Sequence, residues 1–381
     1  MGDLNGPPDL ESCGPVVVVF GTRPEAIKLA PVVRSLRSTG VFDVRVVSTG
    51  QHRELVQQAC GVLEMQVDHD LALMEERQSL PDLVSRAVSG VAAVVRDLRP
   101  SCVVVQGDTA TAFAAALAAF YEKAPVAHVE AGLRSGCQGD PFPEEANRRM
   151  VAALSKWHFA PTERARRNLL DEGIDPAHTL VTGNTGIDTL RWLLESGRGA
   201  SAFQTDRKKI LVTMHRRENQ DTVIPSASHH LRQLADSGYE VVLPLHPSPA
   251  VREVIIPRLQ TSGVQVIEPL GYPDFVRTLA AADLVITDSG GVQEEAPYLG
   301  VPVLVTRRTT ERAEAVDAGL ATVVGEDLAN LGALAVDAIE KPPMSAEVGD
   351  LFGDGYAAGR ITACLTASLR PRAVSSEEQA A

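Results

Sequence analysis

Acidic and basic side chains follow several short apolar runs of this sequence, at the points where strands are expected to end. Four of them could transfer a proton or stabilise an anion: Asp108 in QGDTAT, Glu130 in HVEAGLRSG, Glu144 in PFPEEANRR and His215 in HRREN. Removal and return of a proton require several carboxylates at one site. A histidine followed by two arginines suits a diphosphate. This set of residues predicts proton transfer on a phosphorylated substrate.

Each of these acids also has a structural interpretation. Asp108 could cap the helix that follows it. Glu144 and Glu145 could serve the first turn of a helix, where acidic side chains complement the dipole. Neither interpretation accounts for Glu130, which ends a buried strand. The chemical prediction therefore depends on the set and not on any one acid.

Cations and glycines that suit phosphate groups occur in three further segments. They are Arg23 and Lys28 in GTRPEAIK, Ser289, Gly290 and Gly291 in DSGGVQEEAP, and Arg312 in TTER. Backbone amides near paired glycines at a helix start can approach phosphate oxygens, and Glu294 or Glu295 could accept ribose hydroxyls. His246 also follows a strand, although a solvated histidine would fit there equally well. GTRPEAIK lacks the GxGxxG pattern, so no dinucleotide cofactor is predicted.

The elements that must position these residues alternate between strand and helix. Buried strands are expected at 16–20, 44–48, 102–106 and 125–129, and again at 210–213, 240–243, 264–267, 284–287 and 303–305, with helical stretches between them. Such alternation predicts an α/β fold of two Rossmann-like, doubly wound domains facing a cleft. The expected domains are 15–183, with a final helix at about 355–370, and 184–354, with the linker near 180–186. Residues 1–14 and 371–381 are expected to be disordered.

Composition narrows the possible functions. The 381 residues carry a formal net charge of −13, and 44% are hydrophobic, which fits globular domains rather than a nucleic-acid-binding protein. The five cysteines are scattered without metal-ligand or disulfide spacing. The polar start is unlike a signal peptide, and no apolar run reaches the roughly 20 residues of a membrane span. We expect a cytoplasmic protein with no metal, membrane or nucleic-acid partner.

Taken in order from about Val16 to Gly325, these segments resemble the non-hydrolysing UDP-N-acetylglucosamine 2-epimerases. The motifs that carry the resemblance are GTRPEAIK, STGQHREL, QGDTAT, HVEAGLRSG with PFPEEANRR, HRREN, DSGGVQEEAP and TTER. The resemblance implies a GT-B-like fold, a homodimer, UDP-N-acetylglucosamine and UDP as ligands, and no cofactor. It also implies reversible interconversion with UDP-N-acetylmannosamine, in which UDP leaves, a 2-acetamidoglucal forms and UDP returns.

Roles carry over by motif position. Asp108, Glu130 and Glu144 match the essential carboxylates and His215 the essential histidine, while the choice of C2 base stays open. The positions matching substrate or UDP contacts are Arg23, Lys28, His246, Ser289, Gly290, Gly291, Glu295 and Arg312. Those matching the family's allosteric substrate site include Gln51, Glu54, Arg77 and Arg216. Met214 and Ala313 depart from the family pattern beside His215 and Arg312.

Three other functions compete with this interpretation. A hydrolysing epimerase would release free N-acetylmannosamine, although such relatives differ in the first motif, where this chain has Pro24, Glu25 and Ala26. A glycosyltransferase of the same fold would need an acceptor site, and the many acids would be unexplained. A non-catalytic sugar-nucleotide sensor would not need the complete acid and histidine set.

Overall fold

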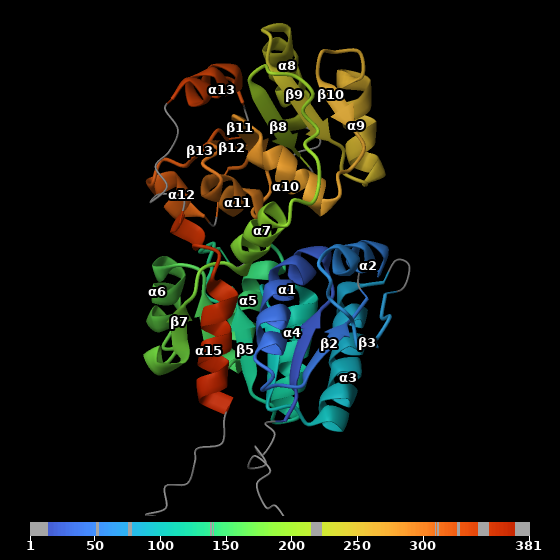
Figure 1. Cartoon of the computed structure of the whole chain (residues 1–381), viewed down its shortest axis with the longest axis vertical. Helices are drawn as coiled ribbons and strands as arrows, with labels where there is room; N and C mark the ends of the chain where they lie inside the picture. The colour runs from blue at the N-terminus through green and yellow to red at the C-terminus, as the bar shows by residue number, and fades with distance from the viewer. Residues whose placement is uncertain are drawn as a thin grey trace, which may run out of the picture.

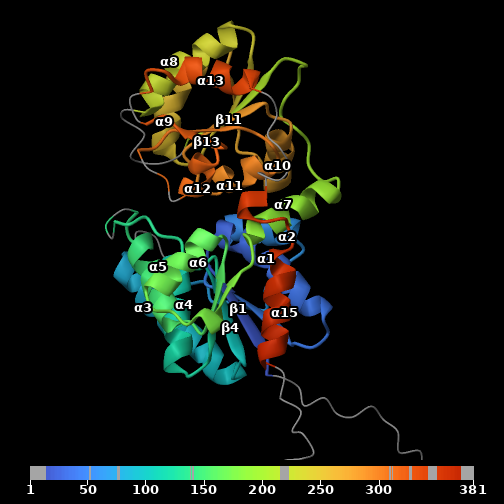
Figure 2. The ribbon, with the colours of Figure 1, turned by 90° about the vertical axis from the view of Figure 1, so that its left-hand side faces the viewer.

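The computed structural model describes residues 14–50, 53–74, 78–137, 139, 141–214, 223–308, 310, 312–325, 328–341 and 350–369. Within these ranges, strands and helices alternate and form two parallel sheets, one in each of the two halves stacked in Figures 1 and 2. The first half contains β1 Val16–Phe20, α1 Arg23–Ser38, β2 Val44–Ser48, α2 Arg53–Val62, β3 His69–Asp70, α3 Leu80–Leu98, β4 Cys102–Gln106, α4 Ala110–Tyr121, β5 Val126–Val129, α5 Glu144–Leu154, β6 Trp157–Ala160, α6 Glu163–Asp171, the short helix η1 Pro176–His178, β7 Thr179–Val181 and α7 Thr185–Glu195.

The second half begins at Lys209. It contains β8 Lys209–Thr213, α8 Val223–Asp236, β9 Glu240–Pro244, α9 Pro249–Leu259, β10 Gln265–Ile267, α10 Tyr272–Ala280, β11 Leu284–Thr287, α11 Val292–Tyr298, β12 Val303–Val305, α12 Ala313–Asp317, β13 Ala321–Val323 and α13 Leu331–Glu340. The short helix η3 Asp350–Phe352 and the helix α15 Ala357–Leu369 complete the described chain.

The first sheet has the strand order β3-β2-β1-β4-β5-β6-β7, and its central strands β1, β4 and β5 are buried at every position. Alternate residues of β1 show why: Val16, Val18 and Phe20 pack with α1 and α2, whereas Val17 and Val19 pack against α3 and α4. A continuous run of β-branched residues is what a strand covered on both sides requires. The order reverses between β1 and β4, where open α/β sheets bind ligands beyond the strand ends.

The second sheet repeats this plan with the order β10-β9-β8-β11-β12-β13. Ile210 and Val212 of β8 pack with α8, and Leu211 packs on the other face with α11 and α12. Each half therefore has its own core on both faces of its sheet. The predicted fold class, two doubly wound parallel α/β sheets, is confirmed.

Helices α7 and α15 join the halves to one another. Helix α7 lies between them in Figure 1 and contacts α1 on one side and α10 and α11 on the other. Helix α15 returns to the first half, where Ala358, Ile361 and Leu365 enter the β1 core. The segment 180–186 that we expected to link the domains is the end of β7, a short turn and the start of α7.

Four short strands were not predicted from the sequence. Strands β3, β6, β7 and β13 have only two to four residues each and lack a continuous apolar run. They are held by pairing to neighbouring strands, as in His158 with Thr179 of β7. The termini that we expected to be disordered lie outside the described residues, except Gly14.

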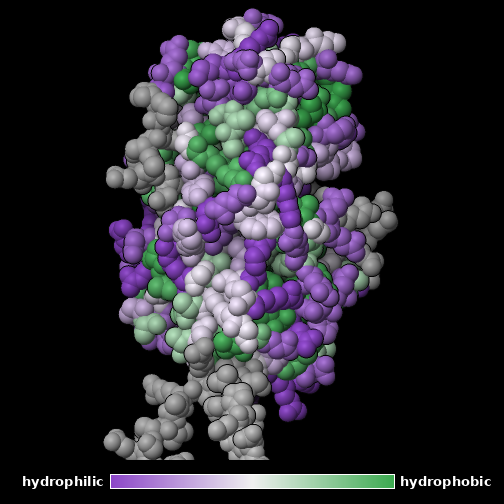
Figure 3. All heavy atoms as spheres, viewed as in Figure 1, coloured by the Kyte–Doolittle hydropathy of each residue, from purple (hydrophilic) through white to green (hydrophobic). Residues whose placement is uncertain are grey.

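The surface in Figure 3 is a mixture of hydrophilic and hydrophobic residues over both halves. Among the described helices, none is long and apolar enough to cross a membrane.

Candidate active site

Five side chains from both halves meet at the carboxyl ends of the strands, and we call them the inter-sheet cluster: Lys28, Glu130, Asn184, Glu294 and Arg312. The Lys28 ammonium contacts the Glu130 carboxylate directly and lies 3.9 Å from that of Glu294. Arg312 Nε donates to Glu294 Oε1 at 2.8 Å. These four charged side chains are at most 14% exposed. Two cations and two carboxylates thus neutralise one another where the sheets meet.

Asn184 links the two carboxylates of this cluster. Its Nδ2 donates to Glu130 Oε2 at 2.9 Å and to Glu294 Oε2 at 2.5 Å. Its Oδ1 accepts from the backbone N–H of Gly186 at 2.8 Å and so caps α7. One amide therefore connects the end of β5, the start of α7 and helix α11.

The cluster separates the proton affinities of its two acids. Burial opposes ionisation of Glu130, but the charges of Lys28 and Arg312 outweigh it and lower the pKa of Glu130 below its ordinary value. Burial raises the pKa of Glu294, although Arg312 and Lys28 oppose that shift. Environments that push the pKa values of two nearby acids apart are typical of acid–base sites. Glu130 is accordingly the stronger acid of this pair.

Glu130 also has an uncommon backbone conformation. Its φ is +64°, in the left-handed region that residues other than glycine rarely adopt. Such residues persist where the surroundings determine them strongly, and they cluster at functional sites. The conformation directs the side chain from the end of β5 toward Lys28 and Asn184.

Asp108 belongs to a second charged group beside the same sheet edge. Arg148 Nε donates to Asp108 Oδ2 at 3.1 Å, and Asn147 donates to the Asp108 carbonyl at 2.9 Å. The residue that caps α4 is Thr109, whose side chain accepts from Ala112 N. The capping interpretation of Asp108 was therefore wrong by one residue. Because β4 pairs with β5 through Gln106 and Val129, Asp108 and Glu130 follow neighbouring strand ends.

The adjacent acids at the start of α5 have different surroundings. Glu145 is fully buried and accepts from Arg148, from Arg149 and from the backbone N–H of Ser135. Glu144 Oε2 is also buried but has no hydrogen-bond partner among the described residues. Glu145 therefore has a structural role, and Glu144 keeps a carboxylate oxygen available for chemistry.

The first two motifs are tied together by a buried acid that the motif assignments did not use. Glu25 Oε2 accepts from the backbone of Gly21 and Thr22 at 3.0 and 2.8 Å, and Oε1 accepts from Thr109 Oγ1 at 2.6 Å. This capping box starts α1, in which Arg23 is exposed at the first position and Lys28 follows five residues later.

On the second half, the glycine pair and Glu295 occupy distinct positions. A Cβ on Gly290 would lie 2.9 Å from the Arg312 guanidinium, so glycine lets this arginine reach Glu294, whereas a Cβ on Gly291 would meet nothing within 4 Å. Ser289 N donates to Thr287 Oγ1 at 2.9 Å.

Burial raises the pKa of Glu295 to about 7. The hydrogen bond from the Tyr272 hydroxyl, which lies 2.8 Å from Glu295 Oε1, opposes this rise.

The remaining predicted residues lie after β9 or outside the described residues. His246 is exposed, and its Nδ1 accepts from Ser248 N at 3.2 Å, in a local turn before α9. His215, Arg216, Gln51 and Arg77 lie outside the described residues, as does the side chain of Glu54 in α2.

The two departures from the family pattern are accommodated by the fold. Met214 packs in the core of the second half, and Ala313 begins α12 directly after Arg312.

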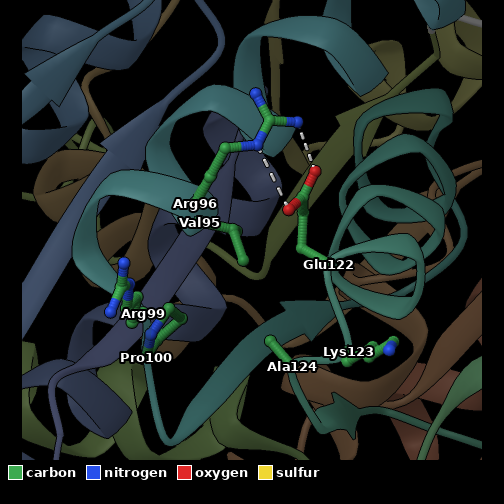
Figure 4. A pocket seen from close by; sticks show the side chains of 7 residues that line it. All are labelled: Val95, Arg96, Arg99, Pro100, Glu122, Lys123 and Ala124. Atoms are coloured by element: carbon green, nitrogen blue, oxygen red, sulfur yellow. Dashed lines mark hydrogen bonds and ion pairs between the residues drawn. The ribbon is translucent and has the colours of Figure 1, made fainter.

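Figure 4 shows a different hollow, at the C-terminal ends of α3 and α4, where Arg96 pairs with Glu122. It borders the residues before β4 and β5, at the opposite end of the strands from the inter-sheet cluster. None of the predicted site residues lines it. Throughout the described ranges, no group of three His, Cys, Asp or Glu side chains is arranged to hold a metal ion.

Sequence reasoning missed three residues at the site: Asn184, Arg148 and Tyr272. Asn184 had a local signal, because an Asn before Thr-Gly at a helix start is a favourable cap. Neither Arg148 nor Tyr272 had one, since only the fold brings them to Asp108 and Glu295.

Comparisons with known proteins agree over most of the chain. Residues 34–366 match a family described as UDP-N-acetylglucosamine 2-epimerase. The chain is 45% identical over 340 residues to the UDP-N-acetylglucosamine 2-epimerase of Neisseria meningitidis serogroup A, which covers 86% of this chain and 91% of that protein. It is 41% identical over 368 residues to the corresponding enzyme of Escherichia coli K12, covering 92% and 98%.

Solved structures give the same answer. The crystal structure of the Neisseria meningitidis UDP-GlcNAc 2-epimerase bound to UDP-GlcNAc superposes with a TM-score of 0.86 at 41% identity, covering 92% of this chain and 99% of that one. A glycotransferase of kitacinnamycin, at 15% identity and a TM-score of 0.63, shares the fold alone. These matches confirm the GT-B-like arrangement.

Proposed function

The chain belongs to the UDP-N-acetylglucosamine 2-epimerase family, and we propose that it interconverts UDP-N-acetylglucosamine and UDP-N-acetylmannosamine without net hydrolysis. In the proposed reaction, the C2 proton is removed as the C1–O bond to UDP breaks, which forms 2-acetamidoglucal. UDP then adds back to C1, and C2 receives a proton on the other face. Atoms and charge balance, because UDP leaves and returns as the same anion.

Stabilisation of the leaving diphosphate is the main electrostatic demand of this scheme. The C2 hydrogen is barely acidic, since no carbonyl is adjacent to C2 in the ring, so departure of UDP must assist its removal. Preorganised cations at a water-excluded site stabilise such an anion more than they would in water. Lys28 and Arg312 are cations of this kind, with side chains only 14% and 10% exposed. We infer that the diphosphate takes over their interactions with Glu130 and Glu294.

Proton transfer needs a carboxylate that is ionised and a second group that delivers a proton. Glu130 is suited to accept a proton, because the neighbouring cations keep it ionised. Glu144, with its unpartnered oxygen, and Asp108, held by Arg148, are the other candidate carboxylates. We propose that these three and His215 share the acid and base roles, and that Ser289, Gly290, Gly291, Glu295 and Arg312 hold UDP.

The single observation that carries this proposal is the convergence of Lys28 and Arg312, from different halves, on two buried carboxylates. Closure of the halves around the glycal would protect the intermediate from water.

On the family resemblance we further propose a cytoplasmic homodimer that is activated by a second substrate molecule. Light scattering during gel filtration measures the oligomeric state. A sigmoidal dependence of the reaction rate on substrate concentration would show the activation.

Proton NMR of the reaction in heavy water tests the proposed function. The purified chain should convert UDP-N-acetylglucosamine to a mixture of both epimers, with deuterium at C2 of each and little free sugar. An unlabelled C2 would exclude proton abstraction, and abundant free N-acetylmannosamine would identify a hydrolase. A Glu130→Gln, Glu144→Gln double variant that converts substrate at the wild-type rate would refute the site assignment.

A further inference from the structure

Asn184 occupies a position that neither the sequence motifs nor the proposed mechanism uses. It is 1% exposed and touches the acids of both halves. Its backbone is also fixed, because its N–H donates to the Phe352 carbonyl at 2.7 Å. The preceding Gly183 passes so close to Gly353 that a Cβ on Gly183 would lie 2.9 Å from the Gly353 Cα. The side chain is therefore presented from a rigid junction.

The hydrogen bonds of Asn184 determine which end of its amide faces the carboxylates. The oxygen Oδ1 is occupied by the N–H of Gly186 at 2.8 Å. The nitrogen Nδ2 has two hydrogens, and it directs one to Glu130 and one to Glu294. Each N–H of the amide thus donates once and its oxygen accepts once, in the orientation that gives two donors to two acceptors.

We propose that Asn184 is a positioning residue of the epimerisation, whose amide orients the Glu130 carboxylate for the substrate while joining it to Glu294 of the nucleotide half. This inference rests on the proposed function, because it concerns the carboxylate that we place in proton transfer. Glu130 Oε2 is held by Asn184 and Lys28. When the diphosphate engages Lys28, the amide of Asn184 is the contact that keeps the carboxylate in place.

Asn184→Asp separates this role from the capping of α7. Aspartate caps helices as well as asparagine does, so the bond to Gly186 N is retained. A carboxylate oxygen replaces Nδ2, so a donor of two hydrogen bonds becomes a negatively charged acceptor that faces Glu130 and Glu294. Misplacing a reacting group by about 1 Å can cost about 100-fold in rate. We expect kcat to fall by about 10- to 100-fold, with a smaller change in KM.

The pH dependence gives a readout that a purely structural role would not move. An added negative charge raises the pKa of a neighbouring carboxyl group. The acid limb of the kcat profile should therefore move to higher pH in Asn184→Asp. Asn330→Asp is the matched control, because it places the same charge at the exposed N-cap of α13, in the other half. It should leave kcat and its pH profile unchanged.

Asn184→Ser provides the second variant, since serine also caps helices but is too short to bond both carboxylates. If Asn184→Asp does not fold, Asn184→Ser decides the question by the same measurements, with thermal unfolding as the check on folding. Wild-type kcat and pH profile in the folded variant tested would overturn the inference and leave the proposed function intact. A wild-type chain that exchanges no C2 hydrogen would overturn both.

Discussion

Replacing Glu294 by glutamine tests whether the inter-sheet cluster is held together by balanced charge. The wild-type cluster contains Lys28, Arg312, Glu130 and Glu294, two charges of each sign. Glu294→Gln leaves one excess positive charge among side chains that are at most 14% exposed. The glutamine oxygen can still accept from Arg312, but its NH2 group then faces the NH2 group of Asn184.

The distances set the size of the expected effect. Opposite charges separated by the 3.9 Å between Lys28 and Glu294 attract by about 4 kcal/mol at an effective dielectric constant of about 20. Removing one partner of a buried pair costs about 3 to 5 kcal/mol. Relief of the repulsion between Glu294 and Glu130 offsets part of this, so we expect about 3 kcal/mol. For a domain of this size that corresponds to a fall in Tm of about 6 to 12 °C.

Thermal unfolding with and without UDP is the assay. UDP brings negative charge to a cluster that has lost one, so it should raise the Tm of Glu294→Gln by more than it raises that of the wild type. Glu295→Gln is the matched control without ligand at pH 7. Its carboxyl group has a pKa of about 7 and is already half neutral there, so replacing it by glutamine should not lower the Tm. A Glu294→Gln chain with the wild-type Tm, or with the wild-type response to UDP, would refute the reasoning.

Two further predictions concern the first turn and the pH dependence of stability. Gly21→Ala should lower the free energy of unfolding by about 1 to 3 kcal/mol, since the new Cβ would lie 2.3 Å from the hydroxyls of Thr49 and Thr111. Gly61→Ala is the control, because its Cβ would meet nothing within 4 Å, and it should not lower the free energy of unfolding. Equal decreases for the two variants in urea unfolding would contradict the steric argument. The raised pKa of Glu295 means that its stabilising contribution is complete below about pH 4.5 and is lost as pH rises through about 7. Glu295→Gln should therefore lose less unfolding free energy than the wild type between pH 5 and pH 8, and parallel curves would show that the group does not titrate in this range.

Local sequence pattern was sufficient for the long elements because their stabilising contacts are adjacent in the chain. Strands β1, β2 and β4 were predicted with the observed ends, since a run such as Val16–Phe20 is apolar at every position. Helix α1 begins at Arg23, because Thr22 and Glu25 form a capping box. Strands such as β3 and β7 depend on pairing with distant segments, which no local window contains.

The types of chemical group at the site were likewise readable from the sequence, whereas their grouping was not. Lys28, Glu130 and Arg312 follow from motifs at strand ends, and the doubly wound plan sends those ends to one edge. The choice between Glu294 and Glu295 was decided by helix α11, which turns the first toward Arg312 and the second toward Tyr272. Adjacent helical residues point about 100° apart, so these identical side chains acquired different partners.

By itself, the sequence determined the two parallel sheets, the family and the residues able to move a proton or hold a diphosphate, because strand periodicity and the order of motifs are written locally. Only the tertiary structure decided that Asn184 lies between Glu130 and Glu294, and that Arg148 holds Asp108. Hydrogen bonds and burial depend on which distant segments come into contact. The pKa of each acid then depends on its burial and on the charges and hydrogen bonds around it.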